Sequence, residues 1–170
     1  MYHHVGPFTR YINGNISAPD TSIQYPSGDL IKFYHGLEPR ISMRWLLPDN
    51  SSIKAGYSYN YQYVHLTALS AVSLPTDIWY PTTDIAKPQV GWQGSVGYFK
   101  NFFDDMIETS VEVYYKKMNN MIEYKEGALP GDNVNDNTDN LLVFGEGWSY
   151  GIELFLKKSI GDFTGWIGYT

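Results

Sequence analysis

The chain has 170 residues, of which 43% are hydrophobic, and a formal net charge of -6. This length is enough for one domain with a sizeable core. No run approaches the ~18 consecutive apolar residues that a transmembrane helix needs, which excludes a helical membrane protein. The 12 Lys and Arg residues are scattered among 18 Asp and Glu residues, so nucleic acid is not an expected partner.

Aromatic residues make up 16% of the chain, with 15 Tyr, 8 Phe and 5 Trp. Tyr and Trp suit an interface that is apolar on one side and wet on the other. The mean hydropathy of -0.32 fits membrane-crossing strands, because such strands alternate apolar and polar side chains. Cysteine is absent, so neither a disulfide framework nor a thiol site is expected.

Loops and strands alternate through the first half of the chain. Residues 6–29 are rich in Pro, Gly, Asn and Ser and predict a loop, after which Leu30 to Tyr34 begin the first strand. Alternation predicts strands over 41–47 and 53–63, joined by a tight turn at 48–51. From 66 to about 88 the pattern lapses into a long loop. Two prolines in the stretch 74–81 oppose any strand or helix.

Two more hairpins are predicted in the second half. The first pairs strands at 90–98 and 107–116 across a turn within 101–105. A polar loop over 127–140 follows, and then a hairpin with strands at 148–157 and 164–170.

About six antiparallel up-and-down strands result, with short turns at one end and long loops, near 6–32, 66–88 and 123–146, at the other. This all-β layout is typical of part of a transmembrane outer-membrane β-barrel, with one strand face toward lipid. The other face carries charged residues, among them Arg44, Lys54, Glu108, Glu112, Glu153 and Lys157. A soluble β-sandwich hides its apolar face in the same way, so periodicity alone leaves both open. Strand length and aromatic crowding near strand ends favour the barrel.

Several short segments occur together in a specific order. They are 37–40 (LEPR), 62–65 (QYVH), 74–79 (LPTDIW), 111–118 (VEVYYKKM), 149–154 (SYGIEL) and 165–170 (GWIGYT). In this order the chain resembles the C-terminal half of the barrel of TonB-dependent receptors. The resemblance implies a barrel of about 22 strands around an N-terminal plug domain, on which an inner-membrane TonB-type coupling protein pulls to admit a nutrient.

We therefore expect residues 1–170 to form a partial receptor barrel in the bacterial outer membrane, with the plug domain absent from this stretch. Its expected partners are the plug, the remaining barrel strands, the coupling protein, outer-membrane lipid and an unidentified nutrient. An alternative is a soluble or surface-attached β-sandwich that binds carbohydrate, with Trp79 and Tyr80 as its platform.

Five loop residues are candidate ligand contacts because they combine aromatic faces with acidic acceptors, a mixture suited to a sugar or a large polar ligand. They are Tyr25, Asp77, Trp79, Tyr80 and Asp84. The competing interpretation is packing of one loop against another, since most loop aromatics simply order the loop.

Neither a catalytic site, a metal site nor a cofactor is expected. Asn135, Asn137, Asp139 and Glu146 fall at calcium-loop positions, but Asn140 replaces the required Gly, so a solvated loop is the preferred interpretation. The four His residues, His3, His4, His35 and His65, lack metal-ligand spacing. Glu108, Glu112 and Glu153 are interpreted as a salt-bridged wall against the plug, near Arg44, Lys54 and Lys157, and not as catalytic carboxylates.

Overall fold

The structure, a computed structural model, describes residues 1–11, 22–67, 78–128 and 138–170. The chain divides into two compact units. We call Leu37–Asn60, Gly91–Met118 and Gly147–Thr170 the sheet unit, and Met1–Gly36, Tyr61–Val90 and Asn119–Glu146 the loop unit. Within the described ranges, the one helical segment is the 3-10 turn η2 (Thr138–Leu141), and no helix is long and apolar enough to cross a membrane.

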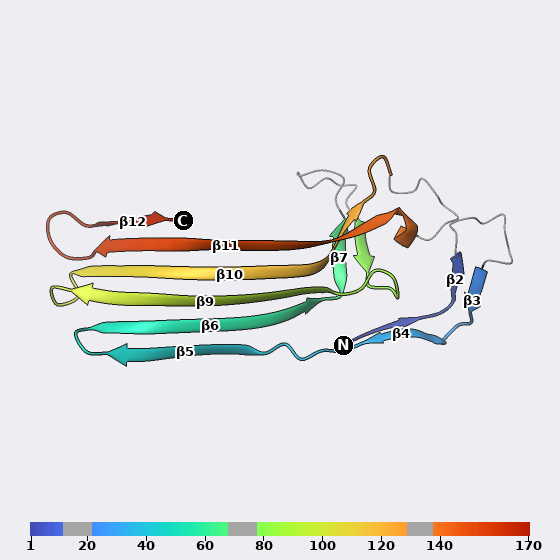
Figure 1. Cartoon of the computed structure of the whole chain (residues 1–170), viewed down its shortest axis with the longest axis horizontal. Helices are drawn as coiled ribbons and strands as arrows, with labels where there is room; N and C mark the ends of the chain where they lie inside the picture. Colours follow the sequence, from blue (N-terminus) through green and yellow to red (C-terminus); the bar gives the residue numbers. More distant parts are fainter. Residues whose placement is uncertain (12–21, 68–77, 129–137) are drawn as a thin grey trace. The chain divides into compact units, whose positions relative to one another are not determined.

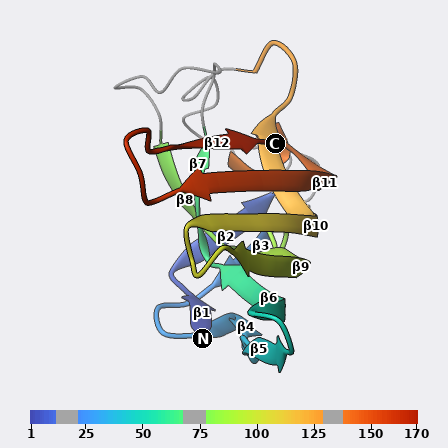
Figure 2. The ribbon, with the colours of Figure 1, turned by 90° about the vertical axis from the view of Figure 1, so that its left-hand side faces the viewer.

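In the described part of the chain, six strands form one sheet in a single layer (Figures 1 and 2). They are β5 (Arg40–Leu47), β6 (Ser51–Gln62), β9 (Gln89–Phe102), β10 (Ile107–Tyr124), β11 (Leu142–Lys158) and β12 (Gly165–Tyr169). Their order in the sheet is β12-β11-β10-β9-β6-β5, and the arrows alternate in direction as an up-and-down arrangement requires (Figure 1). The strands at the two ends, β5 and β12, each have one neighbour in the sheet as described.

Short turns join these strands at one end of the sheet (Figure 1). The β5–β6 turn places Asp49 and Asn50 at φ 63° and 53°, the left-handed region that Asp and Asn tolerate best among residues with a side chain. Neighbouring hairpins are also tied to each other there, since the Asn101 N–H donates to the Asn50 carbonyl at 3.1 Å. The Ser159 N–H likewise donates to the Met106 carbonyl at 2.9 Å.

The sheet has an apolar face and a charged face, because successive side chains on a strand point to opposite sides. In the β5–β6 ladder the pairs Ile41↔Tyr57, Met43↔Ala55 and Trp45↔Ile53 lie on the apolar face, and Arg44↔Lys54 lies on the charged face. Val96, Val113 and Tyr115 continue the apolar face across β9 and β10. Its side chains are exposed: Trp45 is 66% exposed, Tyr150 69% and Ile152 57%.

The described residues of the loop unit form three two-stranded sheets. They pair β1 (Tyr2–Val5) with β4 (Leu30–Tyr34), β2 (Phe8–Tyr11) with β3 (Ser22–Tyr25), and β7 (Val64–Thr67) with β8 (Ile78–Pro81).

Several expectations about element boundaries were wrong. The predicted loop over residues 6–29 contains strands β2 and β3. Leu30–Tyr34 does not begin a strand of the long sheet but pairs with β1. Ile78–Pro81 is a strand despite its proline, because Pro81 is the last residue of a strand that has one partner and therefore needs no ladder N–H there. Strand β10 continues to Tyr124, and β11 already starts at Leu142. The long loops are consequently shorter than the alternation predicted.

Candidate functional site

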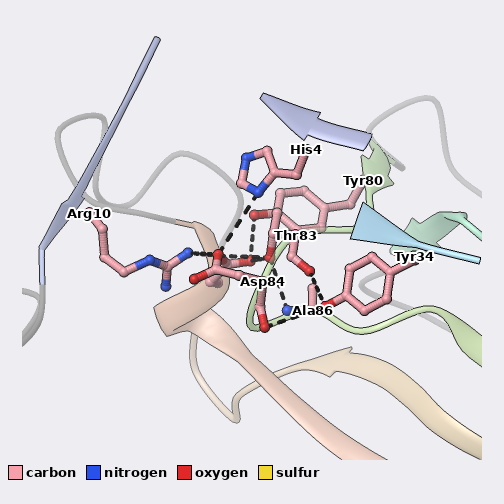
Figure 3. Close-up of polar contacts among 8 residues, drawn as sticks. His4, Arg10, Tyr34, Tyr80, Thr83, Asp84 and Ala86 are labelled. Carbon is pink, nitrogen blue, oxygen red and sulfur yellow. Dashed lines mark hydrogen bonds and ion pairs between the residues drawn. The ribbon is translucent and has the colours of Figure 1, made fainter. Parts of the chain in front are cut away.

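The loop unit contains a buried ion-pair network (Figure 3). Arg10 on β2 pairs with Asp84, which follows β8, and its Nη2 lies 3.3 Å from Oδ2 of Asp139 on η2. Arg10 is 8% exposed and Asp139 is 2% exposed. A buried carboxylate is costly unless it is paired and hydrogen-bonded, so Asp139 depends on these partners.

Two hydroxyl groups also donate hydrogen bonds to the Asp139 carboxylate. The Tyr80 hydroxyl donates to Oδ1 at 2.7 Å, and the Thr83 hydroxyl lies 2.9 Å from Oδ1 and 3.0 Å from Oδ2. Thr83 Oγ1 in turn accepts the Ala86 N–H at 2.9 Å. Burial first, and then the negative charge of Asp139, raise the pKa of Tyr80, which therefore stays a donor at neutral pH.

Strands β1 and β4 join the same network (Figure 3). The Tyr34 hydroxyl donates to the Thr83 carbonyl at 2.9 Å, and His4 Nδ1 lies 3.9 Å from Asp84 Oδ1. Burial, followed by the charges of Asp84 and Asp139, raises the pKa of Tyr34. The network thus joins segments from the beginning, middle and end of the loop unit, and both of its carboxylates, Asp84 and Asp139, have partners within the chain.

The β7–β8 hairpin has its polar side buried and its apolar side exposed. His65, Thr67 and Tyr80 lie on one face, where His65 and Thr67 are each 2% exposed. The opposite face carries Leu66↔Trp79 and Val64↔Pro81, with Trp79 66% exposed and Leu66 and Val64 each 42% exposed. An exposed Trp flanked by aliphatic side chains is a surface suited to contact with another molecule.

The structure brings only some of the candidate ligand contacts together. Tyr80 and Asp84 belong to the buried network, whereas Trp79 points to the other face of its hairpin. Tyr25 ends β3 opposite Phe8, and no described hydrogen bond or ring contact joins it to the other candidates. Asp77 lies outside the described residues. Trp79 is therefore the most accessible of the four that are described.

Sequence reasoning missed Arg10 and Thr83 and gave Asp139 another role. Asp139 was a weak calcium candidate; in the structure it accepts hydrogen bonds from Arg10, Tyr80 and Thr83. Asn135 and Asn137 lie outside the described residues, and the described part holds no cluster of three potential metal-ligating side chains. One signal was available for Arg10, because it is the only charged residue among the first 19, apart from His, and needs a distant acidic partner.

The wall carboxylates lie on the charged face of the sheet unit. Lys157 Nζ lies 2.9 Å from Glu108 Oε1, which confirms one pair of the expected salt-bridged wall. Both side chains are about two-fifths exposed, at 42% and 39%, so this pair stabilises the sheet only slightly. Glu112 and Glu153 line a hollow farther along the same face.

The sequence was compared with known proteins. It matches the family described as "TonB dependent receptor-like, beta-barrel" over residues 10–170. Comparisons with curated proteins and with solved structures give no match. This family is one of transport receptors, not of enzymes. The chain belongs to the β-barrel family of TonB-dependent receptors, and its antiparallel sheet is part of a transmembrane outer-membrane barrel.

Proposed function

We propose that this chain supplies wall strands and external loops of a receptor that takes up a scarce nutrient across the bacterial outer membrane. The observation that carries the proposal is an extensive apolar sheet face that the described residues of the sheet unit leave exposed. Among the described residues the buried hydrophobic side chains are Ala86, Tyr124 and Leu142 alone, and all three belong to the loop unit. A β-sandwich of this size would bury its apolar faces against each other.

The aromatic side chains on the apolar face support the proposal that this face contacts lipid. Tyr57, Trp92 and Tyr115 form a row across β6, β9 and β10, with ring centroids 6.4 Å and 5.3 Å apart. Trp148 and Tyr150 stack on β11 at 5.7 Å. Rows of Tyr and Trp at one level of a barrel wall are typical of the boundary between lipid and water.

The partners follow from the same arrangement. Outer-membrane lipid covers the apolar face, and the remaining strands of the barrel pair with the free edges of β5 and β12. The plug domain of the receptor lies against the charged face, and an inner-membrane TonB-type protein acts on that plug.

Ligand contact is proposed for the loop unit, at Tyr25, Asp77, Trp79, Tyr80 and Asp84. The contacts of the described four suggest different roles. Trp79 and its aliphatic neighbours provide an exposed apolar surface for a ligand. Tyr80 instead stabilises the loop unit through its hydrogen bond to Asp139, and Asp84 does so through its ion pair with Arg10.

The experiment is made on the full open reading frame in its native host. The intact product should fractionate with the outer membrane, migrate faster unheated than heated in gel electrophoresis, and show uptake that stops when the coupling protein is deleted. A soluble product with the same electrophoretic mobility before and after heating would contradict the proposal.

Two substitutions separate ligand contact from general damage. Trp79→Ala should weaken ligand binding by about tenfold, in line with the ~1–2 kcal/mol that an exposed aromatic contact provides. Phe103→Ala is the matched control, because Phe103 is an equally exposed aromatic, 72%, in a short turn of the sheet unit. Equal effects of both changes would remove Trp79 from the ligand site.

A further inference from the structure

Two lysines lie on the apolar face of the sheet unit, at the end with the short turns. Lys100 is on the same side of β9 as Val96, because the two are an even number of positions apart in one strand. Lys158 ends β11 on the side opposite to Lys157, which pairs with Glu108 on the charged face. A lysine that faces lipid costs far less near the head groups than at the bilayer midplane. Both lysines lie in the last three residues of their strands, where such a cation is tolerated.

The two lysines flank the beginning of β10. The Thr109 hydroxyl donates to the Lys100 carbonyl at 2.9 Å, and the Ser159 N–H donates to the Met106 carbonyl at 2.9 Å. These bonds join the ends of β9 and β11 to the first residues of β10, which lies between them in the sheet (Figure 1). Neighbouring strands are ~4.8 Å apart, so β9 and β11 are separated by about 10 Å. Two flexible lysine side chains can therefore converge on one group between them.

Neither lysine has an ion pair among the residues that the structure describes. Lys100 Nζ lies 5.2 Å from the centre of the Phe102 ring. A Cβ on Gly161 would lie 3.5 Å from Lys158 Nζ, which places this ammonium beside the turn between β11 and β12. Glu108 belongs to the opposite face, where it pairs with another lysine. Both ammonium groups are thus available to an anion on the apolar side of the sheet.

Acidic side chains lie beyond the lysines, in the turns. Asp104 and Asp105 are between β9 and β10, and Asp162 is between β11 and β12. All three are exposed, and Asp105 accepts a hydrogen bond from the Asn101 amide at 2.8 Å. This end of the sheet unit therefore has cations at the strand ends and anions in the turns beyond them. That order of charges complements a zwitterionic head group, in which an amine follows a phosphate.

We propose that Lys100 and Lys158 bind the phosphate of an amine-bearing phospholipid, such as phosphatidylethanolamine, in the leaflet at the short-turn end. The inference rests on the proposed function, since the apolar face must contact lipid. Short turns of outer-membrane barrels face the periplasm, so this leaflet is the periplasmic one. The phosphate accepts charge-assisted hydrogen bonds from both ammonium groups. The Phe102 ring, which is 40% exposed, adds apolar surface for the lipid beside Lys100.

Native mass spectrometry of the full-length receptor tests the proposal. The detergent-extracted receptor is titrated with phosphatidylethanolamine, after heat-modifiable mobility has shown that each variant is a folded barrel. We expect Lys100→Gln and Lys158→Gln each to weaken lipid binding about tenfold, because each removes one charge-assisted hydrogen bond. Lys100→Arg and Lys158→Arg keep the charge and should retain most of the binding.

Lys54→Gln is the matched control. Lys54 is also a strand lysine against a phenylalanine ring, with Nζ 3.9 Å from the Phe99 centroid, but it lies on the charged face opposite Arg44. Lipid binding should therefore be unchanged in this variant. Equal weakening in Lys54→Gln would overturn the proposal, since it would show a dependence on net charge and not on this pair of lysines.

Three further results would overturn the proposal. The first is unchanged lipid binding in the Lys100→Gln/Lys158→Gln double variant. The second is displacement of the lipid by inorganic phosphate, which would indicate a site for soluble anions. The third is a preference for phosphatidylglycerol, which would reject the amine-bearing head group. Failure of the proposed function is recognised separately, because a product that does not fractionate with the outer membrane is not carried into the titration.

Magnetic-resonance distance measurements give a second, independent readout. In phosphatidylethanolamine vesicles, isotope-labelled lysine side-chain nitrogens of the receptor should show dipolar coupling to the lipid phosphorus. The coupling should disappear in the Lys100→Gln/Lys158→Gln double variant and persist in Lys54→Gln. A coupling that persists in the double variant would assign the contact to other lysines and contradict the proposal.

Discussion

The two units of the chain are stabilised by opposite means. The sheet unit has its apolar side chains outside and no buried hydrophobic residue among those described, whereas the loop unit buries Arg10, His65, Thr83 and Asp139. The first depends on an apolar solvent and on a continuous ladder of backbone hydrogen bonds. The second depends on a few specific polar contacts. Substitutions should therefore act through different physics in the two units.

The largest effect is expected from Arg10→Met, which leaves Asp139 buried without its cation. Removing one member of a buried pair costs about 3–5 kcal/mol, so amide exchange in β8 and η2 of the intact receptor should accelerate by a hundredfold or more. Lys157→Met is the matched control, because its ion pair with Glu108 is exposed and contributes at most ~1 kcal/mol. Similar acceleration in both variants would show that the network does not stabilise the loop unit.

The next largest effect tests the apolar face. Val113→Lys should cost about 2–4 kcal/mol because it sets a charge at the depth of the lipid chains. Ser110→Lys, on the charged face of the same strand, should cost much less. Folding yields into lipid vesicles, read by heat-modifiable mobility, measure both. A larger penalty for Ser110→Lys would reverse our assignment of the two faces.

A smaller effect concerns close backbone approach in the loop unit. A Cβ on Gly6 would clash with the Pro26 carbonyl oxygen, and backbone cannot move aside as a side chain can. Gly6→Ala should therefore cost about 1–3 kcal/mol, seen as faster proteolysis near β1 and β4. Gly145→Ala is the control, since no atom lies within 4 Å of its added Cβ.

The smallest effect is the pH dependence of the β7–β8 hairpin. Burial lowers the pKa of His65 below its ordinary value of 6.5. The folded hairpin therefore favours neutral His65, and its stability is full above pH 6.5 and declines as the pH falls through the lowered pKa. Exchange of the His65 and Tyr80 amides, which face each other across the ladder, should speed up on acidification, and His65→Gln should flatten the profile. A profile that is unchanged by His65→Gln would assign the titration to another group.

Sequence alone predicted the sheet better than the loop unit, for a physical reason. The faces of β5 and β6 and the turn at Asp49 and Asn50 depend on alternation and turn chemistry, which are local signals. The Arg10–Asp139 contact joins residues 129 positions apart, and no local pattern specifies such a partner. The prediction that Pro81 opposes a strand was also wrong for a non-local reason. A proline is excluded from a strand only where a partner strand needs its N–H, and the local sequence does not show where that is.

The order of strands in the sheet also bears on folding kinetics. Most neighbours in the sheet are neighbours in the chain, so each hairpin closes with little loop entropy and the contact order stays low for an all-β protein. The exception is the pairing of β6 with β9, between which residues 63–88 intervene. The β7–β8 hairpin lies inside that stretch and brings its ends closer before the long pairing forms. Weakening this hairpin should therefore slow the assembly of β9 onto β6.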